Sequence, residues 1–289
     1  MRVARLLHGR IRVLALTSAG ERVPLLRACG VVPLRGNLDQ PATLRRLAGL
    51  ATRVLHLAPP PGEGRTDPRT LALVRVLCLR QPPRSAVYGS TSGVYGDCQG
   101  SSVDETRALR PATARAWRRV DAESQWRWWG RATGVRINIL RIPGIYAPDR
   151  EGGTPRARLS KSVPALRPDD DVYTNHIHAD DLARACVQAV WRGASQRVYN
   201  VNDDTVLKMG DYLDLAADLY GLPRPPRIAR QDAFTQLPPM LLSFMQESRR
   251  MVNVRIKKEL GLQLQYPTVR QGLDTPAAIV SKSANSSTG

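Results

Sequence analysis

The sequence is poor in cysteine and has no long apolar run, and each shortage excludes a class of protein. Its 289 residues contain four cysteines, none of them in a CxxC pair. Scattered cysteines are typical of reduced thiols in the cytoplasm rather than of a disulfide framework. No run of 18 apolar residues is present, which argues against a membrane-spanning helix. Residues 1–13 also lack the apolar core of a signal peptide. We therefore expect a cytoplasmic protein with no membrane partner.

The chain is strongly basic, with 43 Lys and Arg against 25 Asp and Glu and a formal net charge of +18. A charge of this size is typical of proteins that bind nucleic acid. Here the arginines are spread over the whole length, without zinc-finger spacing, an RNA-recognition motif or a compact basic tract. We therefore expect no specific nucleic-acid partner. The charge favours a phosphate-bearing small molecule or nonspecific contact with polyanions.

Strand-like and helix-like patterns alternate through the first half of the chain. Apolar, β-branched runs are separated by segments with helical apolar spacing, of which 113–134 is the longest. The strand-like runs are 10–17, 31–38, 52–61, 85–96 and 135–148. This alternation predicts an α/β fold with a doubly wound, mostly parallel sheet. Ligands of such folds bind in the crevice at the carboxyl ends of the strands.

The composition changes after residue 150, where proline, glycine and charged residues become frequent before helical patterns return. We expect residues 1–150 to form the sheet domain. Residues 151–275 should form a smaller lobe that is interwoven with the end of the sheet. The segment 276–289 is rich in serine and asparagine, which predicts a disordered tail.

The stretch VYGSTSGVYGD at 87–97 places Ser90, Thr91 and Ser92 directly after an apolar strand. A hydroxyl cluster at the carboxyl end of a parallel strand occupies the usual position of a ligand site. The alternative is a serine-rich turn that only ends the strand.

Six blocks in a fixed order carry a family resemblance. They are STSGVYGD at 90–97, DET at 104–106, AE at 122–123, LRIPGIYAP at 140–148, HIHADDLA at 176–183 and VYNVNDD at 198–204. In their order and spacing the chain resembles the extended short-chain dehydrogenase/reductase family, in its NAD-dependent epimerase/dehydratase branch. The resemblance covers nearly the whole chain. It implies a Rossmann-like sheet, a nicotinamide dinucleotide cofactor and a C-terminal substrate lobe.

The beginning of the sequence departs from the family pattern. Family members start with a strand and a glycine-rich turn, GxxGxxG, whose backbone amides receive the pyrophosphate of the cofactor. Residues 1–13, MRVARLLHGRIRV, resemble the second half of the helix that follows, running into the second strand. We therefore expect a Rossmann-like sheet without its first strand, and weakened dinucleotide binding. Either that strand lies upstream of this sequence, or the protein has lost it.

The catalytic positions depart from the pattern as well. The family places a Ser or Thr four residues before the Tyr of VYG, which is Thr91 here, and a YxxxK pair in the long helix. The two YxxxK positions hold Arg115 and Arg119. In the family the Tyr moves the substrate proton, and the Lys lowers the Tyr pKa and holds the nicotinamide ribose. Arginine stays protonated and cannot act as the base, although the Arg119 fork suits ribose or phosphate.

The resemblance also places the cofactor contacts. The turn after the first strand-like run holds Thr17, Ser18 and Arg22, with no acid at the strand end. This turn slightly favours NADP over NAD, unless Arg22 is only a solvated helix residue. The other expected cofactor residues follow later strands or lie on the long helix: Asn37, Leu38, Leu57, Ala58, Pro59, Arg119, Pro143 and Gly144.

Three further residues, Ser92, Tyr95 and His176, are expected at the substrate. The spacing of His176 and His178 ahead of Asp180 and Asp181 suggests a metal site. The family context instead makes one of these aspartates a helix cap, so we expect no metal.

Two functions remain open. The first is an NAD- or NADP-dependent, epimerase/dehydratase-like oxidoreductase with an atypical catalytic pair, acting on a nucleotide sugar or a similar small carbonyl or hydroxyl substrate. The second is a catalytically inactive dinucleotide-binding sensor or scaffold, which the loss of YxxxK favours. A homodimer is one assembly that the sequence allows.

Overall fold

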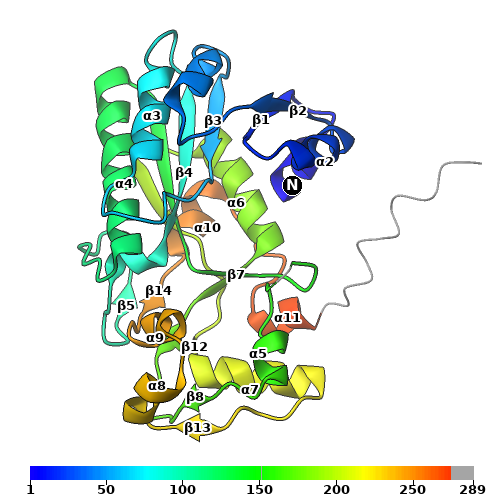
Figure 1. Ribbon diagram of the computed structural model, residues 1–289, viewed down its shortest axis with the longest axis vertical. Coiled ribbons are helices and arrows are strands. Elements are labelled where there is room, and N and C mark those ends of the chain that lie inside the picture. The colour runs from blue at the N-terminus through cyan, green and yellow to red at the C-terminus, as the bar shows by residue number, and fades with distance from the viewer. Residues whose placement is uncertain (151, 275–289) are drawn as a thin grey trace, which may run out of the picture.

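A computed structural model describes residues 1–150 and 152–274 of the chain. The tail expected at 276–289 lies outside these residues. Figure 1 shows a sheet flanked by helices in the upper part of the molecule, with short helices and strands gathered below it.

The main sheet has four parallel strands in the order β11-β6-β4-β3. They are β3 (Arg53–His56), β4 (Ser85–Thr91), β6 (Arg136–Ile142) and β11 (Arg197–Asn200). In the register of the two central strands Ser85 lies opposite Arg136 and Thr91 opposite Ile142. The first six residues of β4 are buried. Near-continuous burial is typical of a parallel strand covered on both faces.

Helices cover both faces of this sheet, as the sequence predicts. On one face lie α3 (Pro68–Leu77) and α4 (Ala114–Thr133), whose Trp126 and Trp129 are fully buried. On the other face lie α6 (Ala179–Arg192) and α10 (Val254–Leu260). The long helix α4 begins where the Thr113 side chain accepts from the Ala116 amide, and it ends at Gly134 with φ of +74°. The doubly wound α/β fold is confirmed.

The first 35 residues form a separate unit beside the sheet (Figure 1). It consists of α1 (Arg2–Leu7), β1 (Val13–Thr17), a 3-10 turn (Gly20–Arg22), α2 (Val23–Ala28) and β2 (Val31–Arg35). Helix α1 packs on α6, and within the described residues β1 pairs with β2 alone, in parallel. No described strand joins β1 to β3. The helical segment expected after β2 is a 3-10 helix (Pro41–Leu47) that packs on α3.

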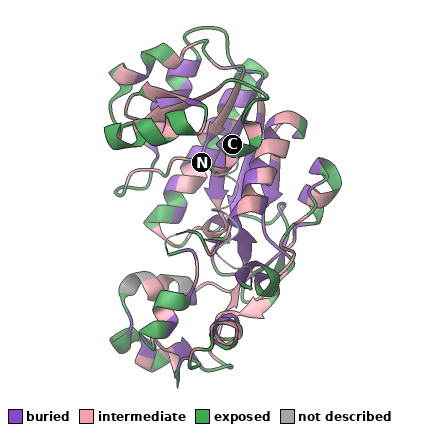
Figure 2. Ribbon diagram, turned by 90° about the vertical axis from the view of Figure 1, so that its right-hand side faces the viewer, coloured by how far each residue is buried: buried purple, intermediate pink, exposed green. Residues whose placement is uncertain are grey.

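The remaining elements are short. The lower group holds α5 (Arg156–Ser160), β8 (Ala165–Leu166), α7 (Met209–Tyr220), β13 (Arg227–Ile228), α8 (Arg230–Gln236), α9 (Pro239–Met245) and α11 (Val269–Leu273). The connecting strands pair two by two: β7 (Gly144–Tyr146) with β10 (His176–His178), β9 (Tyr173–Thr174) with β12 (Leu207–Lys208), and β5 (Ser102–Val103) with β14 (Arg250–Met251). Figure 2 shows buried residues concentrated in the sheet and in the strands leading from it.

Candidate functional site

The hydroxyl cluster lies at the carboxyl end of β4, and its three members face different surroundings. Ser90 is buried, and its hydroxyl donates a hydrogen bond to Glu123 Oε1 at 2.5 Å inside the protein. Thr91 is the last residue of the strand, and its Oγ1 accepts from the Gly93 amide at 3.3 Å. Thr91 and Ser92 are partly exposed. These two hydroxyls are the ones that can reach a ligand at this edge of the sheet.

The two arginines at the YxxxK positions lie one turn apart on α4, beside this edge. Arg119 Nη1 donates to the Gly89 carbonyl at 2.7 Å and to the Tyr88 hydroxyl at 3.2 Å. Arg115 is exposed and lies near Glu247 of the segment before β14. Burial raises the pKa of Glu247, and the charges of Arg249 and Arg115 work against that rise. Helix α4 thus presents two permanent cations where the family has a neutral acid and a lysine.

An ion pair draws the loops after β2 and β3 together. Arg69, in the first turn of α3, donates Nε and Nη2 to the two carboxylate oxygens of Asp39, both at 2.6 Å. Its Nη1 donates to the Pro59 carbonyl at 3.0 Å. Hydrogen bonding to Arg69 lowers the pKa of Asp39. Arg69 thus links Pro59 to Asp39, the residue that follows the predicted cofactor residues Asn37 and Leu38.

The turn after β1 carries a basic group that sequence reasoning missed. Thr17 and Ser18 end the strand, and the Thr17 Oγ1 contacts Ala19. The guanidinium of Arg35, which ends β2, lies across Gly20: a Cβ built there would meet its Nη1 at 2.5 Å. Because Arg35 pairs with Thr17 in the parallel register, strand pairing accounts for this placement. Arg35 thus joins Arg22 in the neighbourhood of the two hydroxyls.

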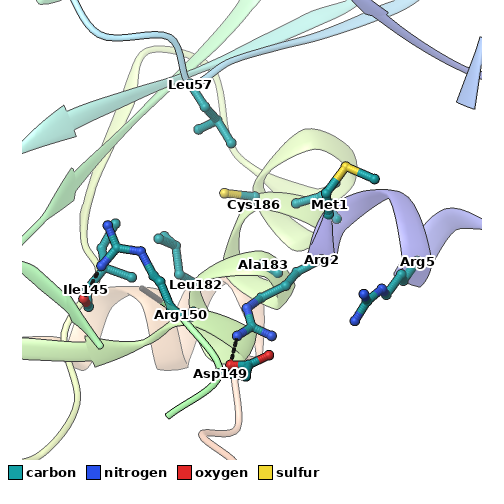
Figure 3. Close-up of a pocket in the computed structure, with 12 residues that line it drawn as sticks. Met1, Arg2, Arg5, Leu57, Ile145, Asp149, Arg150, Leu182, Ala183 and Cys186 are labelled. Atoms are coloured by element: carbon teal, nitrogen blue, oxygen red, sulfur yellow. Dashed lines mark hydrogen bonds and ion pairs between the residues drawn. The ribbon is translucent and has the colours of Figure 1, made fainter. Parts of the chain in front are cut away.

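A cavity of about 560 Å³ opens beyond the ends of β3 and β7 (Figure 3). Its apolar wall includes Leu57, Ile145 and Leu182, and its basic lining comes from Arg2, Arg5 and Arg150. The Arg2 guanidinium contacts both Asp149 and Asp180, and so ties α1 to the start of α6. Of these residues sequence reasoning named only Leu57. Arg2 and Arg5 lie on α1, far in sequence from Arg150, so no local pattern indicates that the three line one cavity.

Two of the predicted substrate residues are buried. The Tyr95 hydroxyl donates to Asn200 Oδ1 at 2.6 Å and accepts from Arg141 Nη1 at 3.1 Å. The His176 ring lies 4.2 Å from the ring of Tyr212, and burial lowers its pKa to about 4. Nearby, burial raises the pKa of Asp203 to about 7. The structure brings Thr91, Ser92 and Arg119 together but keeps Tyr95 and His176 in the interior, and their contact with substrate stays a prediction.

The histidine–aspartate segment has structural partners. His178, rather than an aspartate, caps α6 by accepting from the Asp180 amide at 3.3 Å. Asp181 accepts from the amides of Gln265 and Tyr266. Among residues 1–150 and 152–274, no three His, Cys, Asp or Glu lie close enough to hold a metal ion. No helix of the described part is long and apolar enough to cross a membrane.

Comparison with protein families gives one match over most of the chain. The model of the NAD dependent epimerase/dehydratase family matches residues 3–202. A conserved protein of unknown function from Silicibacter pomeroyi has a similar solved structure, with 32% identity, a TM-score of 0.77, and 94% of this chain and 92% of that chain covered. No curated protein matches the chain.

More distant solved structures share the fold. RMD from Pseudomonas aeruginosa, solved with NADPH, is 20% identical with a TM-score of 0.70, and 91% of this chain and 97% of that chain are covered. UDP-glucuronic acid 4-epimerase from Bacillus cereus, solved with NAD, is 17% identical with a TM-score of 0.74, and 94% and 91% are covered. At these identities the likeness shows the fold alone.

Proposed function

The chain belongs to the NAD dependent epimerase/dehydratase family, and on this premise we propose that it is an oxidoreductase dependent on a nicotinamide dinucleotide. Its substrate is a nucleotide sugar or a similar small carbonyl or hydroxyl compound. The proposal is supported above all by Thr91, which is the last residue of β4. Its hydroxyl lies at the carboxyl edge of the sheet, where Arg119 also contacts the strand. The ligands named for the two distant structural relatives, NADPH and NAD, agree with it.

The donor set at this edge suits a dinucleotide. Arg5 and Arg150 line the cavity and offer cationic donors to a pyrophosphate, whereas the Arg2 guanidinium is held by Asp149 and Asp180. Arg69 links the loop that holds the expected cofactor residues Asn37 and Leu38 to the loop of Ala58 and Pro59, through Asp39 and the Pro59 carbonyl. Pro143, which follows β6, and Gly144, the first residue of β7, remain expected cofactor contacts.

The chemistry follows from the side chains at the edge. A bound nicotinamide would exchange a hydride with a substrate carbon. The Thr91 hydroxyl can donate a hydrogen bond to the reacting substrate oxygen, and Arg119 can hold ribose hydroxyls with its remaining N–H groups. Arg115 stays protonated, so it can stabilise negative charge but cannot accept the substrate proton. The substrate proton therefore passes to solvent water, and the proposed enzyme turns over slowly.

We propose that NADP is preferred over NAD. The Arg35 guanidinium lies across Gly20, in the turn that also holds Thr17, Ser18 and Arg22, and no acid stands at the end of β1. A 2′-phosphate there would accept charge-assisted hydrogen bonds, each worth roughly 1.5–3 kcal/mol. Replacing both arginines by serine should weaken NADPH binding about tenfold or more and leave NADH binding nearly unchanged.

Titration calorimetry with NADPH and NADH tests this preference. Arg27→Ser, an exposed change in the last turn of α2, is the matched control and should leave both affinities unchanged. An equal loss for both nucleotides in the double variant would show that Arg22 and Arg35 do not read the 2′-phosphate. Arg22 would then be a solvated helix residue.

The remaining proposals concern organisation. We propose that residues 151–275 form the substrate lobe. The cysteines are free thiols, which supports a cytoplasmic location. A homodimer is supported by Trp117 and Trp128 on α4, which are 41% and 62% exposed. Large exposed aromatic side chains are typical of contact surfaces.

A further inference from the structure

The amino end of the main sheet is rich in arginine and poor in acidic residues. Three segments that pass through this end, 40–62, 68–96 and 124–148, contain no Asp or Glu. Five of their arginines lie in the last turn of a helix or in the stretch that leads into the next strand: Arg75, Arg80, Arg84, Arg131 and Arg136. We call these five residues the arginine surface. It belongs to the upper end of the molecule in Figure 1, opposite the edge at which β4 ends in Thr91.

Printed sequence order separates these residues, and contacts between the segments bring them together. The Arg84 amide donates to the Thr52 carbonyl at 2.8 Å, and the Arg136 amide donates to the Arg84 carbonyl at 3.3 Å. The Trp129 indole donates to the Cys78 sulfur at 3.0 Å, which holds the end of α4 beside the end of α3. The arginine surface is therefore continuous, and rigid elements fix the backbone of each member.

The charges of the arginine surface are not neutralised within the described part of the chain. Four of its side chains are exposed and that of Arg136 is half-buried, and none of the five makes an ion pair or a side-chain hydrogen bond with a described residue. Arg197, which begins β11, differs because it pairs with Glu259. Arg75 and Arg131 also offset the negative ends of α3 and α4, but a helix end carries only about half a charge. Most of the positive charge is therefore available to a partner.

We propose that the arginine surface binds the phosphate backbone of a nucleic acid without reading its sequence. A guanidinium can donate two parallel N–H groups to the oxygens of one phosphate, so arginine suits this partner well. Several cations on one rigid surface can neutralise several phosphates at once, which supplies most of the affinity of nonspecific binding. Phosphate contacts carry no sequence information, which agrees with the lack of a specific recognition motif in the chain.

A lipid surface is the other large source of phosphate groups, and it suits this end of the molecule less well. Attachment at a lipid interface uses a broad apolar face together with basic charge. The large apolar side chains exposed near the arginine surface are Leu50, Leu79 and Trp128, one from each segment. They therefore form no continuous apolar face of one helix.

Fluorescence anisotropy with a fluorescein-labelled DNA duplex of arbitrary sequence, about two helical turns long, tests the proposal without any cofactor. We expect a dissociation constant of about 10⁻⁴–10⁻⁶ M near physiological salt and tighter binding at lower salt. On logarithmic scales the association constant should fall with salt concentration, with a slope of about −0.9 for each phosphate contacted. Changing Arg80, Arg84 and Arg131 together to glutamine should make this slope less negative by about 2–3 and weaken binding tenfold or more at about 50 mM salt.

Two further variants separate the position of the charges from their number. Changing the same three residues to lysine keeps the charge and should preserve the slope. The matched control changes three exposed arginines of the loops after β5 and β8 and of α11 to glutamine: Arg107, Arg167 and Arg270. Because this control loses the same net charge away from the arginine surface, it should weaken binding by about threefold at most.

Four results would overturn the proposal. The first is no measurable DNA binding by the native chain at about 50 mM salt. The second is an equal loss in the two glutamine variants, which would assign the binding to the net charge of +18 as a whole. The third is sedimentation with phosphatidylglycerol vesicles that needs the three arginines while DNA does not bind, which would assign the surface to a lipid. The fourth is displacement of the DNA by NADPH, which would place it at the opposite edge of the sheet. Since the titrations contain no nicotinamide cofactor, a failure of the proposed oxidoreductase activity would leave the other outcomes unchanged.

Discussion

Changing Arg115 to tyrosine and Arg119 to lysine together should raise the rate of epimerisation or hydride transfer about 10²–10⁴-fold. That is the usual contribution of a positioned general acid–base group. Arg115 and Arg119 lie one turn apart on α4, and Arg119 already touches the end of β4. The double variant would therefore place a titratable hydroxyl and its lysine beside Thr91. The native pair offers two cations and no group that can accept the proton.

The rate would be measured with UDP-glucuronic acid, the substrate named for one structural relative, in the presence of NAD or NADP. Arg131→Lys, an exposed change on the same helix, is the control and should leave the rate unchanged. Thr91→Val in the double variant should abolish most of the gain, because the substrate oxygen loses its hydrogen-bond donor. Turnover of about 10 s⁻¹, typical of ordinary enzymes, by the native chain and insensitive to Thr91→Val would contradict the assigned roles.

The second large effect is expected in the core. Replacing Glu123 by alanine should lower the free energy of unfolding by about 3–5 kcal/mol, because a buried cation loses its partner. Glu123 and Arg141 are 2% and 3% exposed, and their closest atoms are 2.8 Å apart. Glu123 also accepts the Ser90 hydroxyl. The Arg141 pKa is raised, since burial works to lower it and the Glu123 charge more than offsets that effect.

Urea unfolding followed by circular dichroism measures this cost. Glu259→Ala is the matched control, because Glu259 pairs with Arg197 at the surface, with side chains 31% and 42% exposed. Surface pairs contribute about 0–1 kcal/mol. A cost of Glu123→Ala no larger than that of the control would mean that the interior relaxes to solvate Arg141, and the buried pair would lose its structural role.

The regular part of the fold could be predicted because its signals are local. The apolar runs of β3, β4 and β6 are long enough to identify as buried strands, and α4 is marked at both ends by Thr113 and Gly134. The position of Thr91 followed from the same pattern, since the residue ending a parallel strand lies at the edge where ligands bind. The 3-10 geometry at 41–47 was not predicted, since its spacing resembles that of a short helix.

The site could be predicted only in part, because tertiary packing brings together the charged residues that line it. Arg2 and Arg150 meet at one cavity only after α1 packs on α6. Arg35 reaches Gly20 through strand pairing. The Tyr95 hydroxyl is held by Asn200 and Arg141, partners that the sequence does not indicate, and its contact with substrate stays a prediction. A single sequence does not reveal which polar residues have their partners within the protein.

The central claim is that a nicotinamide dinucleotide binds along the carboxyl edge of the sheet, and a crystal structure of the chain soaked with NADPH tests it most directly. The account predicts the nicotinamide beside Thr91 and Pro143, a ribose within hydrogen-bond distance of Arg119, and the adenine against Asn37 and Leu38. Millimolar NADPH should be used, so that a weak site is also occupied. NADPH bound away from Thr91 and Arg119, or at the opposite edge of the sheet, would contradict the account.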